Sequence, residues 1–328
     1  MAKLADVAAL AGVSITTVSR VINDYGAIST KTRNKVHAAM KTLNYQPNSL
    51  ARSLQGKRTK LIGLIFPGVS NPFFGDLVQS LENQLFAQDY RVILCNSANN
   101  AAKEAAYVRM LLANQVDGII TGTHNLTIKE YEEIAAPVIS FDRHLGATIP
   151  IVSSDNFEGG RLATNALVKA GAQAIWIVTG ANRPLSPTNE RLRGYREVMT
   201  QNQLPTHLLE LPFSMAAPLK WARLRQLLQE QRPEAVFATD DLTALMVEEI
   251  ARGMGLSIPG DLKIVGYDGT AAVRATHPGL ATIVQPIPAL SKLMIELLMS
   301  RIEDEAVKLD PQYILPIELH AGTTLLGD

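Results

Sequence analysis

The sequence predicts a small helical domain at the N-terminus and a larger α/β core made of two doubly wound parallel-sheet subdomains. Apolar residues recur at helical spacing in the first 45 residues, whereas from residue 60 short apolar runs alternate with helical stretches. The length of 328 residues allows about two or three domains. With 47% hydrophobic and 19% charged residues, the chain has enough apolar side chains for ordered cores, so a disordered or collagen-like chain is excluded.

The net charge of zero conceals an uneven charge distribution. Residues 1–60 contain ten lysines and arginines but only two acids, Asp6 and Asp24, and the remainder of the chain therefore has an excess of acids. A basic head on an acidic body is expected when the head binds a polyanion such as DNA. A solvated basic surface that binds no DNA would show the same excess of lysine and arginine, so a DNA-binding role also requires a recognisable motif.

Two short helices joined by a glycine turn are predicted in the basic head. Apolar residues recur at helical spacing over 4–11, Gly12 breaks the pattern, and Ser14 can cap a second helix over 15–22. A third helix over about 30–43 would close the core. Such a pair is a helix-turn-helix, whose second helix enters the DNA major groove by its N-terminal end. The residues predicted on the outward side of that second helix are Ile15, Thr16, Thr17 and Arg20.

The same segment resembles the headpiece of the lac/galactose repressor family of bacterial transcription regulators. The resemblance rests on LADVA (4–8), AGVS (11–14), TVSRV (17–21) and YQPN (45–48). It implies a DNA-binding headpiece over 1–46 and a hinge helix and linker over 47–59, whose leucine wedges into the minor groove and bends the DNA. The candidate DNA contacts are Ser14, Ile15, Thr16, Thr17, Arg20, Asn23, Tyr45, Asn48, Ala51 and Leu54.

Seven apolar runs in the rest of the chain are predicted to be buried parallel strands. These runs are 61–66, 90–96, 116–121, 137–142, 174–180, 235–240 and 262–268. Helical stretches such as 74–88 and 103–114 separate them, which is typical of parallel sheets with crossover helices. Ligands of open parallel sheets bind beyond the carboxyl ends of the strands, so the residues that follow these runs are the candidate site.

The residues at these strand ends are polar and aromatic, as a sugar site requires. Carboxylates and amides bind vicinal hydroxyls, an arginine fork holds adjacent oxygens, and aromatic rings cover the CH surface of the sugar. The candidates from strand ends are Asn71, Phe73, Phe74, Phe141, Asp142, Arg143, Asp240, Asp241 and Asp268. An acid after a strand can instead serve as a helix N-cap, and we favour that role for Asp241, which precedes the helical run 242–253.

Residues 60–328 resemble the periplasmic-binding-protein-like core of the same family, and their motifs resemble its ribose-binding branch. The resemblance implies a first lobe of about 60–157 and 287–316 and a second lobe of about 158–286 and 317–328. The effector contacts that it implies are Asn71, Phe73, Phe74, Asp142, Arg143, Arg191, Phe213, Asp240, Asp268 and Gln285.

Other stretches resemble the sucrose operon repressors of Gram-positive bacteria, among them ARSLQGK (51–57) and FATDDLT (237–243). The two resemblances imply a sugar-responsive repressor of a carbohydrate operon, which a sugar in the interlobe cleft releases from a palindromic operator. Sucrose or fructose is the expected operon class. A ribose operon repressor, or a catabolite regulator with a phosphorylated carrier protein as corepressor, remains an alternative.

Several function classes are excluded by missing motifs. A single cysteine, Cys95, permits neither an intrachain disulfide nor a cysteine zinc cluster, and no histidine has a second ligand at metal spacing. No dinucleotide or phosphate loop and no nucleophile elbow is present, so neither an enzyme nor a cofactor is expected. Without a signal peptide or membrane span, we expect a cytoplasmic homodimer whose partners are operator double-stranded DNA and a sugar or sugar phosphate.

Overall fold

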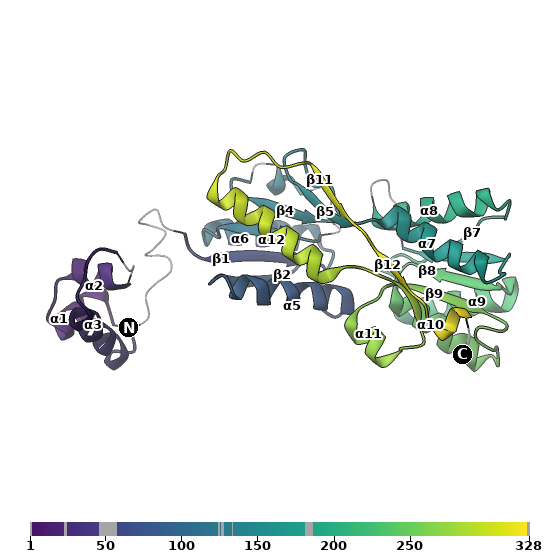
Figure 1. Cartoon of the computed structure of the whole chain (residues 1–328), viewed down its shortest axis with the longest axis horizontal. Helices are drawn as coiled ribbons and strands as arrows, with labels where there is room; N and C mark the ends of the chain where they lie inside the picture. Colours follow the sequence, from purple (N-terminus) through teal and green to yellow (C-terminus); the bar gives the residue numbers. More distant parts are fainter. Residues whose placement is uncertain are drawn as a thin grey trace. The chain divides into compact units, whose positions relative to one another are not determined.

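The computed structural model describes residues 2–22, 25–45, 58–123, 125, 128–132, 134–180 and 186–326. The chain divides into two compact units, Met1–Thr59 and Lys60–Asp328 (Figure 1). The first unit is helical and the second contains two parallel-sheet α/β lobes, so the predicted fold class is confirmed.

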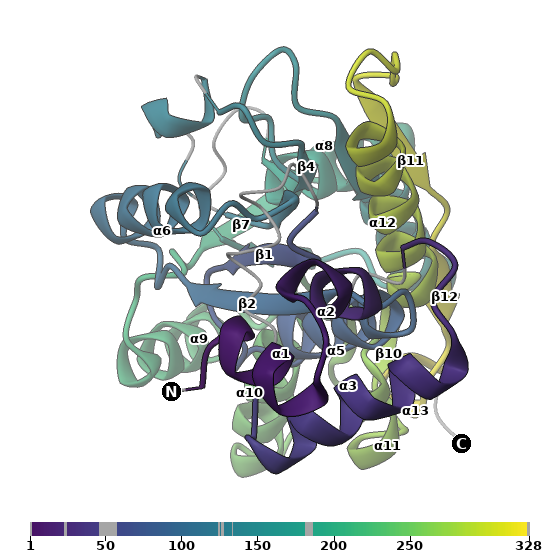
Figure 2. The ribbon, with the colours of Figure 1, turned by 90° about the vertical axis from the view of Figure 1, so that its left-hand side faces the viewer.

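The first unit is built from three helices around one small core. They are α1 (Leu4–Ala11), α2 (Ile15–Ile22) and α3 (Thr30–Thr42), seen in dark purple in Figure 2. Gly12 ends α1 with φ 65°, a left-handed conformation that glycine adopts without strain. The core contains the fully buried side chains of Val7, Val18 and Val36, one from each helix. This core is complete within the unit, because all of its members lie between residues 4 and 45.

The first lobe of the second unit is a six-stranded parallel sheet in the order β11-β5-β4-β3-β1-β2. Its strands are β1 (Leu61–Phe66), β2 (Arg91–Asn96), β3 (Gly118–Thr121), β4 (Val138–Phe141), β5 (Ile151–Ser154) and β11 (Gln312–Leu315). Its helices are α5 (Pro72–Phe86), α6 (Ala101–Ala113), the 3-10 helix η1 (Lys129–Tyr131) and α12 (Ile287–Glu303). Helices α5 and α12 bury their apolar sides on one face of the sheet, and α6 covers the other face.

The second lobe is a six-stranded sheet in the order β12-β10-β9-β8-β6-β7. Its strands are β6 (Ile175–Thr179), β7 (His207–Glu210), β8 (Ala235–Ala238), β9 (Lys263–Asp268), β10 (Ala281–Val284) and β12 (Glu318–His320). Its helices are α7 (Asn156–Lys169), α8 (Pro187–Gln201), α9 (Ala217–Gln231), α10 (Asp241–Gly253), α11 (Ala271–Thr276) and α13 (Thr323–Leu326). Only β12 departs from the predicted parallel arrangement among the described strands, because it pairs antiparallel with β10 at the sheet edge.

The chain passes between the two lobes at three places. The crossings are from β5 to α7, from β10 to α12, and from β11 to β12, the last of which is visible in yellow in Figure 1. Each crossing is two residues long or shorter. The two sheets are therefore joined by three short connections beside one another, and the strand ends of both lobes border the space between them.

No single helix in the described ranges is long and apolar enough to cross a membrane. Helices α1 and α2 together have the length and apolar composition of a membrane span, but the chain bends by 103° between them.

Candidate functional site

A cavity between the two lobes brings the predicted effector contacts together. The empty space, including its open mouth, is about 540 Å³. All ten predicted contacts line it, namely Asn71, Phe73, Phe74, Asp142, Arg143, Arg191, Phe213, Asp240, Asp268 and Gln285. The cavity is also lined by Phe141, which was a candidate from a strand end, and by Gly122, Pro187 and Thr239, which the prediction did not place there. Thr239 is buried and directly follows β8, so the rule that found Asp240 at this strand end could also have found Thr239.

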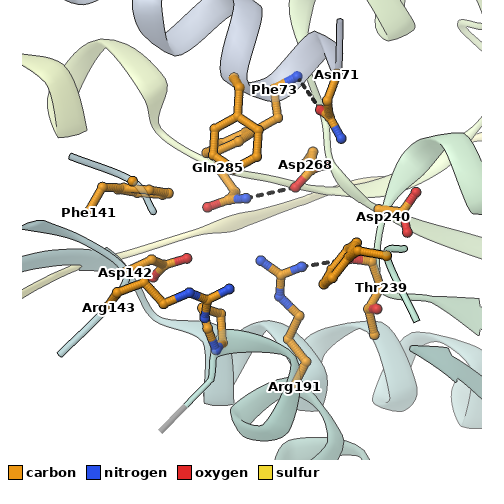
Figure 3. Close-up of a pocket in the computed structure, with 14 residues that line it drawn as sticks. Asn71, Phe73, Phe141, Asp142, Arg143, Arg191, Thr239, Asp240, Asp268 and Gln285 are labelled. Carbon is orange, nitrogen blue, oxygen red and sulfur yellow. Dashed lines mark hydrogen bonds between the residues drawn. The ribbon is translucent and has the colours of Figure 1, made fainter. Parts of the chain in front are cut away.

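Aromatic rings form one wall of the cavity, on the first lobe. Asn71 caps α5 by accepting a hydrogen bond from the backbone N–H of Phe73 at 2.8 Å, and Pro72 begins the helix (Figure 3). This turn places the ring of Phe73 5.5 Å from that of Phe74 and 5.5 Å from that of Phe141, measured between centroids. Such rings provide an apolar surface for the CH groups of a sugar. From the second lobe, Phe213 reaches the same cavity with 46% of its surface exposed.

Two charged residues, the half-buried Asp142 and the buried Arg143, follow β4. Asp142 has φ 62°, and its carboxylate accepts a hydrogen bond from the amide of Asn156 at 3.0 Å. Burial raises the pKa of Asp142, and the neighbouring guanidinium groups of Arg143 and Arg191 oppose that rise. Burial lowers the pKa of Arg143, which is 9% exposed. Its Nη1 atom is buried without a hydrogen-bond partner among the described residues, so it is a donor available to a ligand.

Arg191 enters the cavity from α8 of the second lobe and is held on three sides. Its Nε donates to the side-chain oxygen of Asn156 at 2.9 Å, and its Nη1 donates to the carbonyl oxygen of Thr239 at 2.6 Å. The guanidinium carbon lies 3.5 Å from the ring centroid of Tyr267, a cation–π contact. Figure 3 shows the guanidinium pointing toward the centre of the site. These contacts fix the arginine before any ligand binds.

Two helical glycines let α7 and α8 approach closely enough to place Arg191. A Cβ atom on Gly160 would lie 2.1 Å from the carbonyl oxygen of Arg191, and one on Gly194 would lie 2.2 Å from that of Phe157. Both distances are far below van der Waals contact. The absence of a side chain at these two positions is therefore a condition for the geometry of the site.

Asp268 is a buried carboxylate at the end of β9. Its Oδ1 accepts a hydrogen bond from the amide of Gln285 at 2.8 Å, and Gln285 in turn accepts one from the hydroxyl of Ser154 at 2.8 Å. Burial raises the pKa of Asp268 well above the ordinary range; Arg191 opposes this, and the carboxylates of Asp241 and Asp240 add to it.

The structure corrects the predicted role of Asp241, because the N-cap of α10 is Asp240. Asp240 has extended backbone, and its carboxylate accepts hydrogen bonds from the N–H of Thr243 at 2.8 Å and from its hydroxyl at 2.7 Å. Asp240 thus both caps the helix and lines the cavity. Asp241 lies inside the lobe, accepts from the hydroxyl of Thr282 at 2.5 Å and from the N–H of Gly269 at 2.8 Å, and its burial raises its pKa to about 7.

Helix α2 of the first unit exposes three of the four residues predicted on its outward side, whereas Thr17 is half-buried. Ser14 accepts a hydrogen bond from the N–H of Thr17 at 3.1 Å and so begins the helix. Ile15, Thr16 and Arg20 are exposed, with Ile15 at 51% despite its apolar side chain. Tyr45 instead packs partly against the core of the unit. Asn23, Asn48, Ala51 and Leu54 lie outside the described residues.

No group of three metal-ligating side chains occurs among the described residues. Cys95 is buried in β2, and burial raises the pKa of its thiol to about 11, so the reactive thiolate is disfavoured.

Two family models match the chain. Residues 3–48 match bacterial regulatory proteins of the lacI family, and residues 164–325 match a periplasmic binding protein-like domain. The sucrose operon repressor of Pediococcus pentosaceus is 52% identical over 322 residues, which cover 98% of this chain and 99% of that protein. The ribose operon repressor of Halalkalibacterium halodurans is 36% identical over 329 residues, which cover 100% of this chain and 98% of that protein.

Among solved structures, the lac repressor dimer bound to operator and the anti-inducer ONPF matches with a TM-score of 0.85 and 29% identity over 99% of both chains. The expected resemblance to sucrose and ribose operon repressors is confirmed by these matches, and so is the expectation of a regulator rather than an enzyme. Since a relative that is 52% identical spans nearly the whole chain and the headpiece matches the family model, the chain belongs to the lacI family of bacterial regulatory proteins.

Proposed function

We propose that this protein is a sugar-responsive repressor of a sucrose-utilisation operon, with its effector site in the interlobe cavity. The observation that carries the proposal is the lining of that cavity, where three carboxylates, two arginines and a phenylalanine wall from both lobes face one space. This set binds hydroxyls and covers an apolar ring face, which is the chemistry of a sugar site. The similarity to a sucrose operon repressor supports the operon class.

The charges of the cavity favour an unphosphorylated sugar. Asp142, Asp240 and Asp268 present acceptor oxygens, and a sugar hydroxyl can donate a hydrogen bond to each while accepting one from Arg143. A phosphate group brings a charge of about −1.5 to −2 at neutral pH and almost no O–H donor. It would therefore add a further anion to a cavity that already has three carboxylates, without donating hydrogen bonds to them. Sucrose and fructose are accordingly stronger candidates than their phosphate esters.

The operator is bound by α2 of the headpiece in this proposal, and the protein acts in the cytoplasm as a homodimer. The exposed start of α2 presents Thr16 and Arg20, whose hydroxyl and guanidinium groups read base edges in the major groove. A dimer would present two such helices to a palindrome. The lac repressor, which this chain resembles over its whole length, forms a dimer on its operator, which supports the same assembly here.

Effector binding releases the operator by shifting the lobes of each protomer. A sugar held between Asp142 and Arg143 on one lobe and Arg191 and Asp268 on the other favours the closed cleft. We propose that the closed arrangement weakens DNA binding by a coupling free energy of about 1 to 3 kcal/mol, a typical range for allosteric proteins.

The test is fluorescence anisotropy of a labelled palindromic operator, titrated with the protein and then with sucrose, fructose, ribose and their phosphate esters. Release by sucrose or fructose is expected. Release by ribose alone would make the protein a ribose operon repressor, the second candidate, which the 36% identity to such a repressor favours. Tight DNA binding that no sugar changes would contradict the proposed function and would point to a protein corepressor.

A further inference from the structure

The side chain of Asn156 lies behind the effector cavity, at a crossing between the two lobes. Asn156 is the first residue of α7 and follows β5 after the single residue Asp155. It is 7% exposed, and it is not among the residues that line the effector cavity. Any influence of Asn156 on the effector must therefore pass through its neighbours.

The amide of Asn156 joins a ligand-binding group of one lobe to a ligand-binding group of the other. Its Nδ2 donates to Oδ1 of Asp142 at 3.0 Å and to the carbonyl oxygen of Ser154 at 3.1 Å. Its Oδ1 accepts from Nε of Arg191 at 2.9 Å and lies 3.4 Å from the hydroxyl of Tyr267. Asp142 follows a strand of the first lobe, whereas Arg191 belongs to a helix of the second.

The polarity of the amide matches the charges on either side of it. The charged and titratable groups near it include Asp142 and Arg143 after β4, Arg191 on α8 and Tyr267 on β9. A second pocket, which Asn156 lines together with Asp142, is also bordered by His144, Asp155 and Glu190. An amide provides a donor for the carboxylate and an acceptor for the guanidinium in one planar group. A carboxylate at this position would accept from Arg191 but repel Asp142, and an apolar side chain would leave both groups without this partner.

A second amide makes a parallel link at the next crossing. Gln285, between β10 and α12, donates to Asp268 of the second lobe at 2.8 Å and accepts from the hydroxyl of Ser154 of the first lobe at 2.8 Å. Because Asn156 donates to the carbonyl of the same Ser154, the two amides belong to one hydrogen-bonded chain from Asp142 to Asp268. Buried chains of this kind hold their members in one arrangement.

We propose that Asn156 is a positioning residue that holds Asp142 and Arg191 in the relative arrangement in which both bind the effector. It thereby transmits effector binding from the first lobe to the second. This inference rests on the proposed sugar-sensing function, and it assigns the coupling between the lobes to a residue that does not touch the sugar.

The test uses the full-length Asn156→Asp variant, with D-fructose and D-ribose as probes and calorimetry at pH 5.5 and pH 8. At pH 8 the introduced carboxylate repels Asp142, so we expect sugar binding to weaken at least about tenfold, the loss of one hydrogen bond to a charged group. Burial and the neighbouring Asp142 favour protonation of the introduced carboxyl at pH 5.5, where it offers one O–H donor in place of the two N–H donors of the amide. We therefore expect a smaller loss of sugar affinity, relative to the wild type, than at pH 8.

Two controls separate positioning from packing. Asn100→Asp makes the same change at the exposed N-cap of α6, where the side-chain oxygen accepts from Lys103 N–H, and it should follow the wild type at both pH values. Asn156→Leu removes the polarity of the side chain but keeps its size, and it should bind sugar weakly at both. Operator affinity without sugar should stay within about twofold of the wild type for Asn100→Asp, since this residue is exposed and the headpiece core is separate.

Equal loss at both pH values for Asn156→Asp, or wild-type affinity at both, would overturn the inference while leaving the proposed function intact. If Asn156→Asp does not fold at pH 8, the double variant Asp142→Asn with Asn156→Asp should fold there, because the introduced carboxylate then faces an amide donor. Failure of this double variant to fold would also overturn the inference. A wild-type protein that binds neither sugar and responds to none would instead contradict the proposed function.

Discussion

Replacing Asp268 by alanine should abolish the sugar response without loss of operator binding. Asp268 is 8% exposed and lines the cavity, and its Oδ1 already accepts from Gln285 at 2.8 Å, so we expect Oδ2 to accept from the sugar. A hydrogen bond to a charged group contributes about 1.5 to 3 kcal/mol. Its loss corresponds to a sugar dissociation constant about 10 to 150 times larger.

The substitution also removes the partner of Gln285, which links β10 to Ser154. The loss of sugar affinity should therefore lie near the upper end of this range, while Asp268→Asn, which keeps an oxygen for Gln285, should lie nearer the lower end. Calorimetry gives the sugar affinity, and anisotropy of the labelled operator gives DNA affinity with and without sugar. Glu305→Ala, at an exposed acid after α12, is the control that should change neither quantity.

Operator affinity in the absence of sugar should stay within a few-fold of the wild type, because the headpiece has its own core. If the alanine variant binds sugar with wild-type affinity, Asp268 does not contact the effector and the site assignment is wrong. If it loses operator binding together with sugar binding, the effect is one of folding, which the asparagine variant and thermal unfolding would reveal.

Three further predictions follow from the packing, the charges and the hinge. Gly160→Ala should lower the free energy of unfolding by about 1 to 3 kcal/mol and weaken sugar binding, because the added Cβ would lie 2.1 Å from the carbonyl oxygen of Arg191. Thermal unfolding measures the change in stability. The control is Gly253→Ala at the end of α10, where an added Cβ would have no neighbour within 4 Å, and it should be neutral or stabilising. Burial raises the pKa of Asp241 to about 7, so the folded protein retains a proton that the unfolded chain loses near pH 4. The free energy of unfolding should therefore fall as pH rises from about 4 to 7. Urea titrations across this range should show a smaller fall for Asp241→Asn, and an equal fall would show that Asp241 does not have this raised pKa. Leu54→Ala should weaken specific operator binding by more than about 1 kcal/mol, because a wedge in the minor groove supports the DNA bend; equal weakening on random DNA in a filter-binding assay would refute the hinge role.

Most of the strands that the sequence predicted contain buried apolar runs. Strand β3 (Gly118–Thr121) and strand β8 (Ala235–Ala238) are buried at every residue, so their pattern has few competing explanations. The edge strands β7 (His207–Glu210) and β11 (Gln312–Leu315) have no fully buried residue, because partly buried and exposed residues alternate along them. Such short alternating segments resemble loops in composition, so no apolar run indicated them.

The candidate site was predictable because strand ends of parallel sheets converge. The choice between Asp240 and Asp241 was not, because both are good N-cap residues and only the extended backbone of Asp240, with φ −154°, selects it. The sequence also gave no indication of Asn156. An asparagine after a strand is usual at a helix start, and its two partners, Asp142 and Arg191, are 14 and 35 residues away in the chain.

The three crossings between the lobes also determine the order in which the protein matures during synthesis. The core of the headpiece is complete by residue 45, whereas the first-lobe core includes Ile287 to Leu298 of α12, and both sheets receive their last edge strands from residues 312–320. At a translation rate of about 5 to 20 residues per second, some tens of seconds separate the two events. A nascent chain therefore carries a folded DNA-binding domain well before it has a sensor. A chain that stops before residue 312 would have the headpiece core complete but would lack the edge strands β11 and β12 of the two lobes.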